Sequence, residues 1–460
     1  MGMQNSLLQQ YRHRLSETAY KELSRSFGKC LPRKLLKNPR GTSRNRNYTL
    51  PVTFWAFLWQ ALQGNGSCLQ AVQKVQALLL ALRSRPVSLN TSAFCQARNR
   101  IQFSWLRAIH RHVARQLAQS GAARHAFGRR VCVVDSTTVT LPDTAENRQR
   151  YRTATGQKPG CGFPLLKIGA LFCLGTGALL EYVTAPWPVH DSRLLRRLLK
   201  SLLIGDILLA DRAFCSYASI AELRAHGVDV LFRLHQARIT TRDRVRQLGK
   251  HDQLIRWEKP VQRTRNMSLE RFRKLPPTLE LRQIKVVIPI PGFRTRVLYL
   301  VTTLCDSHRD PAAKLADLFR QRWQAELYFR DIKISLRMEQ LHCRCPAMVH
   351  KELAVYLIAY NLIRWLILQA ATVARDSTAP ISFKATIGFL QHCSWLAHVG
   401  RKLIPSLLPL IALCRVRQRP NRAEPRAVKR RPKPYQYLSN HRHLMVVTIH
   451  RDKYRKPSLS

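Results

Sequence analysis

The stretch RVCVVD at residues 130–135 marks the point where the pattern of the chain changes from helical to β-strand. It is a short run of β-branched and apolar residues ending in an acid, which predicts a strand. Two more strand-like runs follow, PLLKIGALFCLG at 164–175 and ALLEYVTA at 178–185, with a turn between them at 175–177. Together the three runs predict an antiparallel meander.

Helices and strands alternate after the meander. A helical pattern, DSRLLRRLLKSLL (191–203), precedes a buried strand, DILLAD (206–211), and a second helix from Tyr217 to Ala225 precedes the strand VDVLFRL (228–234). Three antiparallel strands followed by alternating helices and strands are the order of an RNase H-like domain. The expected fold class is therefore α/β, with an RNase H-like catalytic domain.

The regions on either side have other patterns. Residues 1–125 contain apolar helical segments rich in basic residues, and after 235 the alternation gives way to turns, many arginines and strand-like pieces. A long helix begins near Pro311. We expect a basic helical DNA-binding domain (1–125), the first part of the catalytic domain (126–235), an inserted β-rich domain (236–298), the second part of the catalytic domain (299–375), and a basic C-terminal helical region with a tail (376–460).

The charge of the chain points to a polyanionic partner. There are 78 Lys and Arg residues against 26 Asp and Glu, a formal net charge of +52. No globular fold needs this excess, and nucleic acid is the usual partner of such a surface. An anionic membrane surface is the alternative. The most apolar stretch, 352–374, is interrupted by Asn361 and Arg364, which favours a buried helix over a membrane span.

The cysteines indicate a reducing compartment. Twelve of them are scattered without a disulfide framework, and the start of the chain shows no secretory signal. Both observations predict reduced thiols in the cytoplasm. The run HCRC at 342–345 is the only tight cluster, but no second ligand pair follows it at zinc-finger spacing, so a metal role there is disfavoured.

Two acids follow apolar runs that are expected to be neighbouring strands. Asp135 ends the first strand and Asp211 ends DILLAD, so both carboxylates should emerge at one edge of the sheet. Two adjacent carboxylates repel each other, and a divalent cation removes the conflict. Mg²⁺ or Mn²⁺ suits oxygen ligands, and two such ions serve phosphoryl transfer. The other interpretation is that both acids are helix caps or turn formers.

A third acid, Glu326, lies on the long helix in LFRQRWQAELYFRDIKISL (318–336). On a regular helix of about 100° per residue, Phe319, Arg322, Glu326 and Lys333 would lie within an arc of about 60°. One stripe would then carry an aromatic ring, two cations and a carboxylate. The alternative is an ordinary ion pair between residues i and i+4, worth about 0.2–0.5 kcal/mol.

The chain resembles DDE transposases of the insertion-sequence-four family. The family pattern Y-x2-R-x3-E-x6-K stands here as Phe319, Arg322, Glu326 and Lys333. VVDSTTV and LLADRAF resemble the strands of the first two acids. Further similar blocks are GQKPGCGFP (156–164), HDQLIRWEKP (251–260) and KELAVYLIAYNLIR (351–364). The departures are Phe319, where the family usually has Tyr, and Ser136, where Gly is common.

The resemblance implies a role for each matching residue. Asp135, Asp211 and Glu326 would be catalytic and would bind two Mg²⁺ or Mn²⁺ ions. The DNA-binding residues implied are Arg322, Lys333, Phe319, Trp257, Arg212 and Arg256. Trp257, from the inserted β-rich domain, would stack on a flipped base near the cut, an interaction worth about 1–3 kcal/mol. Its alternative role is that of a core Trp in a small β domain.

The implied activity is DNA transposition. Water activated by the metal ions would nick the element ends, and the freed 3′-OH would attack the opposite strand as a hairpin or the target DNA. The partners would be double-stranded transposon ends and target DNA. We expect a homodimer on DNA and no membrane association, in a bacterial cytoplasm at the nucleoid. The alternatives are a metal-dependent nuclease without strand transfer and a catalytically inactive DNA-binding transposon remnant.

Overall fold

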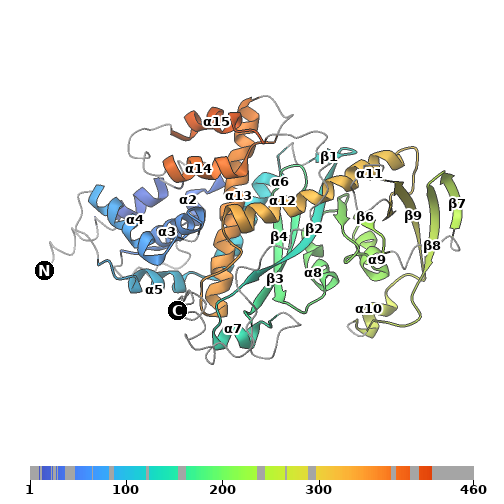
Figure 1. The fold of residues 1–460 in the computed structure, drawn as a ribbon, viewed down its shortest axis with the longest axis horizontal. Helices are drawn as coiled ribbons and strands as arrows, with labels where there is room; N and C mark the ends of the chain where they lie inside the picture. The colour runs from blue at the N-terminus through green and yellow to red at the C-terminus, as the bar shows by residue number, and fades with distance from the viewer. Residues whose placement is uncertain are drawn as a thin grey trace, which may run out of the picture.

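A computed structural model gives the fold of the protein. The residues that the structure describes are 10, 13–21, 23, 27, 30–36, 47–64, 66–81, 88–120, 124–153, 162–235, 244–264, 267–287, 297–374, 380–393 and 403–416. Within them the fold is a mixed α/β arrangement of one large sheet and flanking helices (Figure 1). The basic tail predicted after 415 lies outside the described residues, apart from its first two positions.

The sheet has the strand order β4-β3-β2-β5-β6-β10-β9-β8-β7, and β1 pairs with β2 beside this path. Strand β5 is parallel to both β2 and β6, whereas the other pairs are antiparallel. The strands are β1 (Arg124–Ala126), β2 (Arg129–Thr140), β3 (Leu165–Cys173), β4 (Leu179–Pro186), β5 (Ile207–Ala210), β6 (Asp229–Arg233), β7 (Arg244–Gly249), β8 (Asp252–Glu258), β9 (Thr278–Val287) and β10 (Val297–Thr302).

Helices cover both faces of this sheet and form the N-terminal part of the chain (Figure 1). The α-helices are α2 (Arg33–Leu36), α3 (Leu50–Leu62), α4 (Cys68–Ala81), α5 (Ser92–Arg100), α6 (Phe103–Ala118), α7 (Ala145–Arg150), α8 (Asp191–Leu198), α9 (Tyr217–Ala225), α10 (Leu269–Arg273), α11 (Ala312–Arg320), α12 (Gln324–Arg330), α13 (Pro346–Ala374), α14 (Phe383–Cys393) and α15 (Leu403–Leu413).

The predicted meander is confirmed, with one correction to its first strand. Strands β2, β3 and β4 pair antiparallel in sequence order. Strand β2 does not end at Asp135, however, because its pairing with β3 continues to Thr140 opposite Leu165. Only its pairing with β5 stops early, at Val133 opposite Leu209. Asp135 therefore lies within a strand, at the place where the neighbouring strand has ended.

The two faces of the sheet bury two separate apolar clusters. Along β2, Val131 and Val133 belong to the cluster beneath α12 and α13. Cys132 and Val134 belong to the cluster beneath α8 and α9. This is the alternation expected of a strand covered on both sides. Odd-numbered positions of β2 therefore point toward α12, and even-numbered positions point toward α8.

The segment predicted as an inserted β-rich region extends the same sheet. Strands β7, β8 and β9 form an antiparallel ribbon, and β9 pairs with β10 along six residues, from Val297 opposite Val287 to Thr302 opposite Arg282. This ribbon lies at the end of the molecule opposite the N-terminal helices (Figure 1). Residues 236–243 and 288–296 of the segment lie outside the described ranges.

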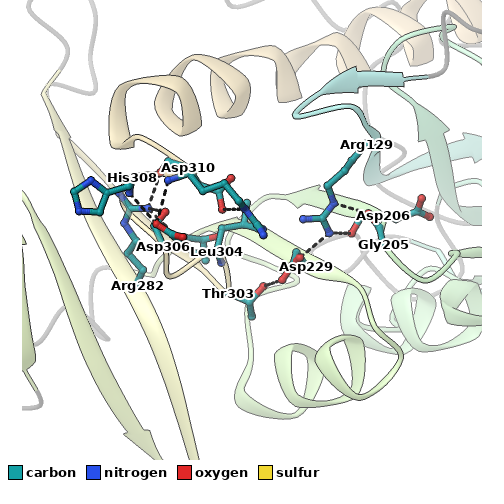
Figure 2. A network of polar contacts seen from close by, with 12 residues as sticks. Arg129, Gly205, Asp206, Asp229, Arg282, Thr303, Leu304, Asp306, His308 and Asp310 are labelled. Atoms are coloured by element: carbon teal, nitrogen blue, oxygen red, sulfur yellow. Dashed lines mark hydrogen bonds and ion pairs between the residues drawn. The ribbon is translucent and has the colours of Figure 1, made fainter.

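A buried arginine joins the ribbon to the loop before α11. Arg282 on β9 is fully buried and forms a two-pronged ion pair with Asp252 on β8, at 2.8 and 2.6 Å. Its remaining nitrogen donates to the main-chain oxygens of Leu304 and Asp310, at 3.2 and 2.6 Å (Figure 2). Because a buried guanidinium needs all these partners, the ribbon is fixed to the segment that leads into α11.

Helix α13 forms the centre of the core. It is the one helix among the described residues with the length and apolarity to cross a membrane, and 72% of its apolar window is buried inside the protein. Its residues pack against α3, α6 and the cluster of β2 and β3. The prediction of a buried helix over 352–374 is confirmed.

Candidate active site

The parallel register of β2 and β5 brings Asp135 and Asp211 together. Val131, Cys132 and Val133 pair with Ile207, Leu208 and Leu209, so two positions further on Asp135 stands opposite Asp211. Asp135 comes two positions after Val133, and Asp211 comes two positions after Leu209. Both apolar residues belong to the cluster beneath α12. Because side chains two positions apart lie on the same face of a strand, the two acids extend from the same face of the sheet. The expectation of two neighbouring strands is confirmed.

Each of these carboxylates is held by the main-chain amide that follows it. Asp135 Oδ1 accepts a hydrogen bond from Ser136 N at 2.8 Å, and Asp211 Oδ1 accepts one from Arg212 N at 2.7 Å. The second oxygen of Asp135, Oδ2, lies 3.9 Å from a guanidinium nitrogen of Arg322. The local backbone therefore orients both acids in the same way.

Electrostatic strain is concentrated at Asp135. Burial raises the pKa of its carboxyl to about 6, the Ser136 amide and the Arg322 guanidinium oppose this rise, and the charges of Asp211 and Glu326 add to it. The three acids predicted to act together are thus close enough to influence one another's ionisation. Such a cluster of mutually repelling carboxylates is typical of functional sites.

The helix that carries Glu326 is not regular, which corrects the predicted stripe. Between α11 and α12 the segment Gln321–Trp323 is a 3₁₀ turn, and Asp331–Ser335 after α12 is a π-helical turn. The two turns change the rotation per residue, so an arc counted at a constant angle does not hold. Glu326 is exposed and Phe319 is buried, although both were placed on one stripe.

Arg322 lies between two of the acids. One guanidinium nitrogen is 3.9 Å from Asp135 Oδ2, and the other is 3.4 Å from Glu326 Oε1. The ordinary i,i+4 ion pair considered from the sequence is therefore present, and the same arginine also reaches the sheet. Its side chain is only 16% exposed, so the guanidinium is held over the acids rather than free in solvent.

The other residues of the predicted pattern are placed differently. Lys333 lies in the π-helical turn, with its ammonium group 3.6 Å from a carboxylate oxygen of Glu339. The ring of Phe319 is 6% exposed and belongs to the main core cluster. Burial of this ring favours a packing role over contact with DNA, and it explains why a residue without a hydroxyl is accommodated there.

Trp257 lines a cleft on the other face of the sheet. It packs in the cluster beneath α8 and α9 and is 9% exposed. The cleft measures about 1160 Å³, and Arg212, the residue after the second acid, also lines it. Further lining residues are His190, Arg193, Arg196, His235 and Arg271. The structure brings Trp257 and Arg212 together in a basic cleft.

Arg256 is on the opposite side of the ribbon from Trp257. Successive residues of a strand point to opposite faces. Trp257 is buried in the cleft, whereas Arg256 is exposed and stands opposite Glu280 on β9. Both residues are among the predicted DNA-binding residues, but a single straight DNA segment in the cleft would not contact both.

The sequence reasoning missed two features of this region. Trp323, directly after Arg322, is 51% exposed, and the polar residues around it in the sequence were the available signal. Asp331 is paired with Arg364 of α13 at 2.9 Å, and this pair holds the π-helical turn that carries Lys333. An acid and a basic residue inside otherwise apolar helices were the available signal for this pair.

The three acids fit divalent metal ions by their chemistry. Carboxylate oxygens are the ligands that Mg²⁺ and Mn²⁺ prefer. Burial, and to a smaller extent the charges of Asp211 and Glu326, raise the pKa of Asp135, and a bound cation would favour its charged form. As the described side chains are arranged, no three His, Cys, Asp or Glu residues stand close enough to hold one ion. The positive charge nearest to Asp135 and Glu326 is instead the Arg322 guanidinium.

A family model described as "Transposase DDE domain" matches residues 126–362, more than half of the chain. Among curated proteins, the chain is 24% identical over 402 residues to the transposase InsG for insertion sequence element IS4 of Escherichia coli (strain K12), covering 86% of this chain and 88% of that protein. It is also 29% identical over 141 residues to the putative transposase InsZ of the same organism, covering 30% of this chain and 46% of that protein.

A shorter match is the probable transposase for insertion sequence element IS5377 of Geobacillus stearothermophilus, 36% identical over 72 residues, covering 16% of this chain and 19% of that protein. Among solved structures, the chain is similar to the piggyBac transposase synaptic complex with hairpin DNA, with a TM-score of 0.43 and 10% identity over 86% of this chain and 82% of that chain. A likeness this low carries no weight for fold or function.

The matched region begins just before β2, which bears Asp135, and extends past Glu326 into α13. The relative encoded by an IS4 element is alike over nearly the whole of both chains. The chain therefore belongs to the transposase DDE domain family, and it is a DDE transposase of the IS4 type.

Proposed function

We propose that this transposase cuts and rejoins DNA at the ends of an insertion sequence by metal-dependent phosphoryl transfer, on an RNase H-like catalytic fold. The observation that carries this proposal is the register of β2 and β5, which sets Asp135 opposite Asp211, together with Arg322 between Asp135 and Glu326. The order of three antiparallel strands followed by parallel β5 and β6 supports the RNase H-like assignment.

Asp135, Asp211 and Glu326 would hold two Mg²⁺ or Mn²⁺ ions. When bound, such ions activate the attacking oxygen and stabilise the leaving oxygen of the phosphodiester. The protein's own part is to orient Asp135 and Asp211, each through one hydrogen bond from the main-chain amide that follows it, of Ser136 and of Arg212. Glu326 is exposed and forms an ion pair with Arg322, so its carboxylate is accessible and would complete the set of acids that could hold the ions.

Arg322 and Lys333 would bind DNA phosphates beside the acids. In this arrangement the Arg322 guanidinium lies between Asp135 and Glu326, and its donors would also suit a DNA phosphate at the same place. Lys333 is held near Glu339, an exposed acid, so its charge is available at the surface. Phe319 would support Arg322 from the core.

The basic cleft with Trp257 and Arg212 would hold a base turned out of the duplex. Its volume of about 1160 Å³ exceeds that of a nucleotide, and one aromatic face with several arginines provides stacking and charge neutralisation. Arg256, on the opposite side of the ribbon, would contact the DNA backbone outside the cleft. The exposed Trp323 provides a second surface for stacking near Arg322.

Two ends must be joined to move an element, so we propose a homodimer on DNA, acting on transposon ends and target DNA in a bacterial cytoplasm at the nucleoid. The domain division predicted from the sequence, with a basic helical N-terminal part for DNA binding, belongs to this proposal. So does the cut-and-paste route through a hairpin intermediate.

The test compares wild type with Glu326→Ala and, as a matched control, Asp317→Ala on the preceding helix, whose carboxylate is exposed and pairs only with Arg320. Each protein is incubated with DNA carrying the inverted repeats that flank its gene, a target plasmid, and Mg²⁺ or Mn²⁺. We expect nicked, hairpin and joined products with wild type and Asp317→Ala, and none with Glu326→Ala. All three proteins should bind the end DNA equally.

Each alternative predicts another pattern of products. If wild type cleaves DNA without forming any joined product, the protein is a metal-dependent nuclease. If wild type binds DNA without metal-dependent cutting, it is an inactive transposon remnant. Full activity of Glu326→Ala would remove this residue from the catalytic set.

A further inference from the structure

A polar network joins the first acid to the helix on the other side of the sheet. Ser136, the residue after Asp135, donates its hydroxyl hydrogen bond to Asp191 Oδ1 at 2.7 Å. The ammonium group of Lys167 lies 2.8 Å from the same Oδ1. Ser136 also provides the main-chain amide that orients the carboxylate of Asp135, at 2.8 Å. One residue thus contacts the catalytic acid through its backbone and the network through its side chain.

The alternation of β2 explains why this network lies apart from the catalytic acids. Asp135 points toward α12, so Ser136 points toward α8, whose first residue is Asp191. Ser136 stands opposite Gly169 of β3, where an added Cβ would come within 2.9 Å of the Leu194 Cβ on α8. This close approach of helix and sheet brings the Asp191 carboxylate within reach of the Ser136 hydroxyl.

The network is fixed on both sides of Asp191. The side chains of Lys167 and Asp191 are only 13% and 19% exposed. Lys167 also donates to the main-chain oxygen of Val189 at 3.0 Å, in the turn that precedes α8. A half-buried ion pair with an additional acceptor has a defined geometry, and charge-assisted hydrogen bonds of this kind are stronger than neutral ones.

We propose that Asp191 and Lys167 are positioning residues for Asp135, acting through the Ser136 hydroxyl. This inference rests on the proposed function, since it assigns a role at the same site. Asp135 has no support from β5, which ends its pairing at Val133 opposite Leu209. The Ser136 side chain anchors this part of β2 to α8 instead, and it thereby fixes the amide that orients Asp135.

The network also connects the acids with the basic cleft. The residues on either side of Asp191, His190 and Ser192, line the cleft that contains Trp257. Helix α8 therefore carries one wall of the cleft and, through Asp191, the support of Asp135. A substrate that moves α8 would change the orientation of the first acid.

The test uses Ser136→Ala, which removes the hydroxyl, and Ser136→Thr, which keeps it and suits a β-strand. Lys167→Met removes the charge that holds Asp191. The matched control is Ser201→Ala, which removes a hydroxyl beyond the other end of the same helix. Mn²⁺ affinity is measured by calorimetry on the full-length, DNA-free protein, and the rate of end nicking is measured as a function of Mn²⁺ concentration.

We expect Ser136→Ala and Lys167→Met to lose Mn²⁺ affinity and nicking rate by about 10- to 100-fold, the usual effect of removing a residue that orients a metal ligand. Ser136→Thr and Ser201→Ala should resemble wild type within about twofold. The affinity for end DNA and the melting temperature without Mn²⁺ should be unchanged in the three serine variants, because a purely structural role would alter these values first. Lys167→Met should also lower the melting temperature, because it leaves the Asp191 carboxylate without its partner in a largely buried ion pair.

The inference is overturned if Ser136→Ala binds Mn²⁺ like wild type, if Ser136→Thr fails as badly as Ser136→Ala, or if the loss in Ser136→Ala is accompanied by a lower melting temperature. It is also overturned if wild type binds no Mn²⁺. A different result concerns the proposed function alone: if wild type binds Mn²⁺ in a manner that depends on Ser136 but cuts no DNA, the positioning role stands and the transposition reaction does not.

Discussion

At the scale of single residues, the candidate site contains an acid, Asp135, whose charged form the fold does not stabilise. Asp135 lies in strand β2 directly after four buried residues, 131–134, and its pKa is raised to about 6, chiefly by burial. The folded protein therefore favours the protonated form. Protonated Asp135 therefore contributes to the free energy of unfolding. This contribution is fully present below the ordinary Asp pKa and is lost as the pH rises through about 6.

Replacing Asp135 by Asn should therefore stabilise the protein at pH 7.5 while abolishing cleavage. The Asn amide oxygen can still accept from Ser136 N, and the buried charge is removed. We expect a gain of about 1–3 kcal/mol without divalent ions, allowing for the partial exposure of the side chain. Denaturation in the presence of EDTA measures it at pH 7.5 and pH 4.

The gain should shrink at pH 4, where the wild-type carboxyl is protonated in the folded state. A variant less stable than wild type at pH 7.5 would contradict the charge conflict proposed for this position. Asp206→Asn is the opposite control, because Asp206 is paired with Arg130 at 2.5 Å and its loss should destabilise.

Trp257 offers a second test at this scale. Trp257→Phe keeps a ring in the cleft, whereas Trp257→Ala removes it. If the ring stacks on a flipped base, Trp257→Ala should weaken the cleavage complex by about 1–3 kcal/mol, a roughly 5- to 150-fold loss, with a smaller loss for Trp257→Phe. Fluorescence of 2-aminopurine placed near the end of the element reports the flipped base.

Arg256→Ala is the matched comparison, since Arg256 is the neighbouring residue on the opposite side of the ribbon. It should lower DNA affinity without altering the 2-aminopurine signal. Equal 2-aminopurine signals in wild type and Trp257→Ala would show that Trp257 does not stack on a flipped base and serves as a core residue.

At the scale of elements, the helix of the third acid depends on a buried ion pair. The π-helical turn after α12 contains Asp331, whose side chain is 10% exposed, bonded to Arg364 at 2.9 Å. The Arg364 guanidinium also lies over the rings of Tyr328, Tyr360 and Phe383, at 4.9 to 5.3 Å from their centroids. The pair thus connects the turn carrying Lys333 to the central helix α13.

Arg364→Met should destabilise the protein by about 3–5 kcal/mol, because it leaves the Asp331 carboxylate buried without its partner. Urea denaturation measures the change. Lys274→Met, which breaks an exposed pair with Glu270, should cost less than about 1 kcal/mol. A loss in Arg364→Met no larger than that of Lys274→Met would show that the pair is not needed to hold the turn.

The elements differ in how well the sequence predicts them. Helix α9 begins and ends at the predicted residues because Ser216 caps its first turn, accepting from Ser219 N, and a glycine in the left-handed region follows it at Gly227. Strand β5 is a short apolar run between turns, and the sequence predicts its position equally well. Local signals of this kind fix the ends of an element.

The irregular turns around Glu326 could not be predicted in this way. Whether a helix has a 3₁₀ or a π-helical turn is decided by what its side chains meet across the fold, and Arg364 lies 33 residues beyond Asp331. The burial of Phe319 and the continuation of β2 past Asp135 have the same cause, since both depend on contacts with distant segments. The nearness of Asp135 and Asp211 could be predicted because each follows an apolar run, which is a local signal.

At the scale of the whole molecule, charge and the continuous sheet determine how DNA can be held. The excess of 52 positive charges is distributed along the entire chain, so no single patch accounts for it. Main-chain hydrogen bonds run without a break from the meander through β10 to the ribbon of β7, β8 and β9. The candidate acids and the ribbon are therefore parts of one continuous sheet, although the cleft with Trp257 lies on the face opposite the acids.

Binding of DNA should accordingly depend steeply on salt. Each phosphate neutralised contributes about −0.9 to the slope of log K against log salt concentration, so six to ten contacts would lower affinity by about 10³–10⁵ between 50 and 200 mM salt. Fluorescence anisotropy with end DNA and with unrelated DNA measures both slopes. If the two DNAs give similar slopes but end DNA binds more tightly, phosphate contacts set the salt dependence and base contacts set the difference in affinity. An affinity that does not change with salt would contradict a phosphate-dominated interface.

The alternation of side chains along β2 has a consequence for how copies of the gene decay. A substitution in this strand changes one side chain. The loss of a single codon between 131 and 134 shifts the rest of β2 by one residue, so that each of its later side chains points to the other face of the sheet. The carboxylate of Asp135 would then point beneath α8, and the Ser136 hydroxyl would point toward Glu326. We therefore expect an in-frame deletion here to abolish cleavage, while the basic residues elsewhere in the chain remain unchanged.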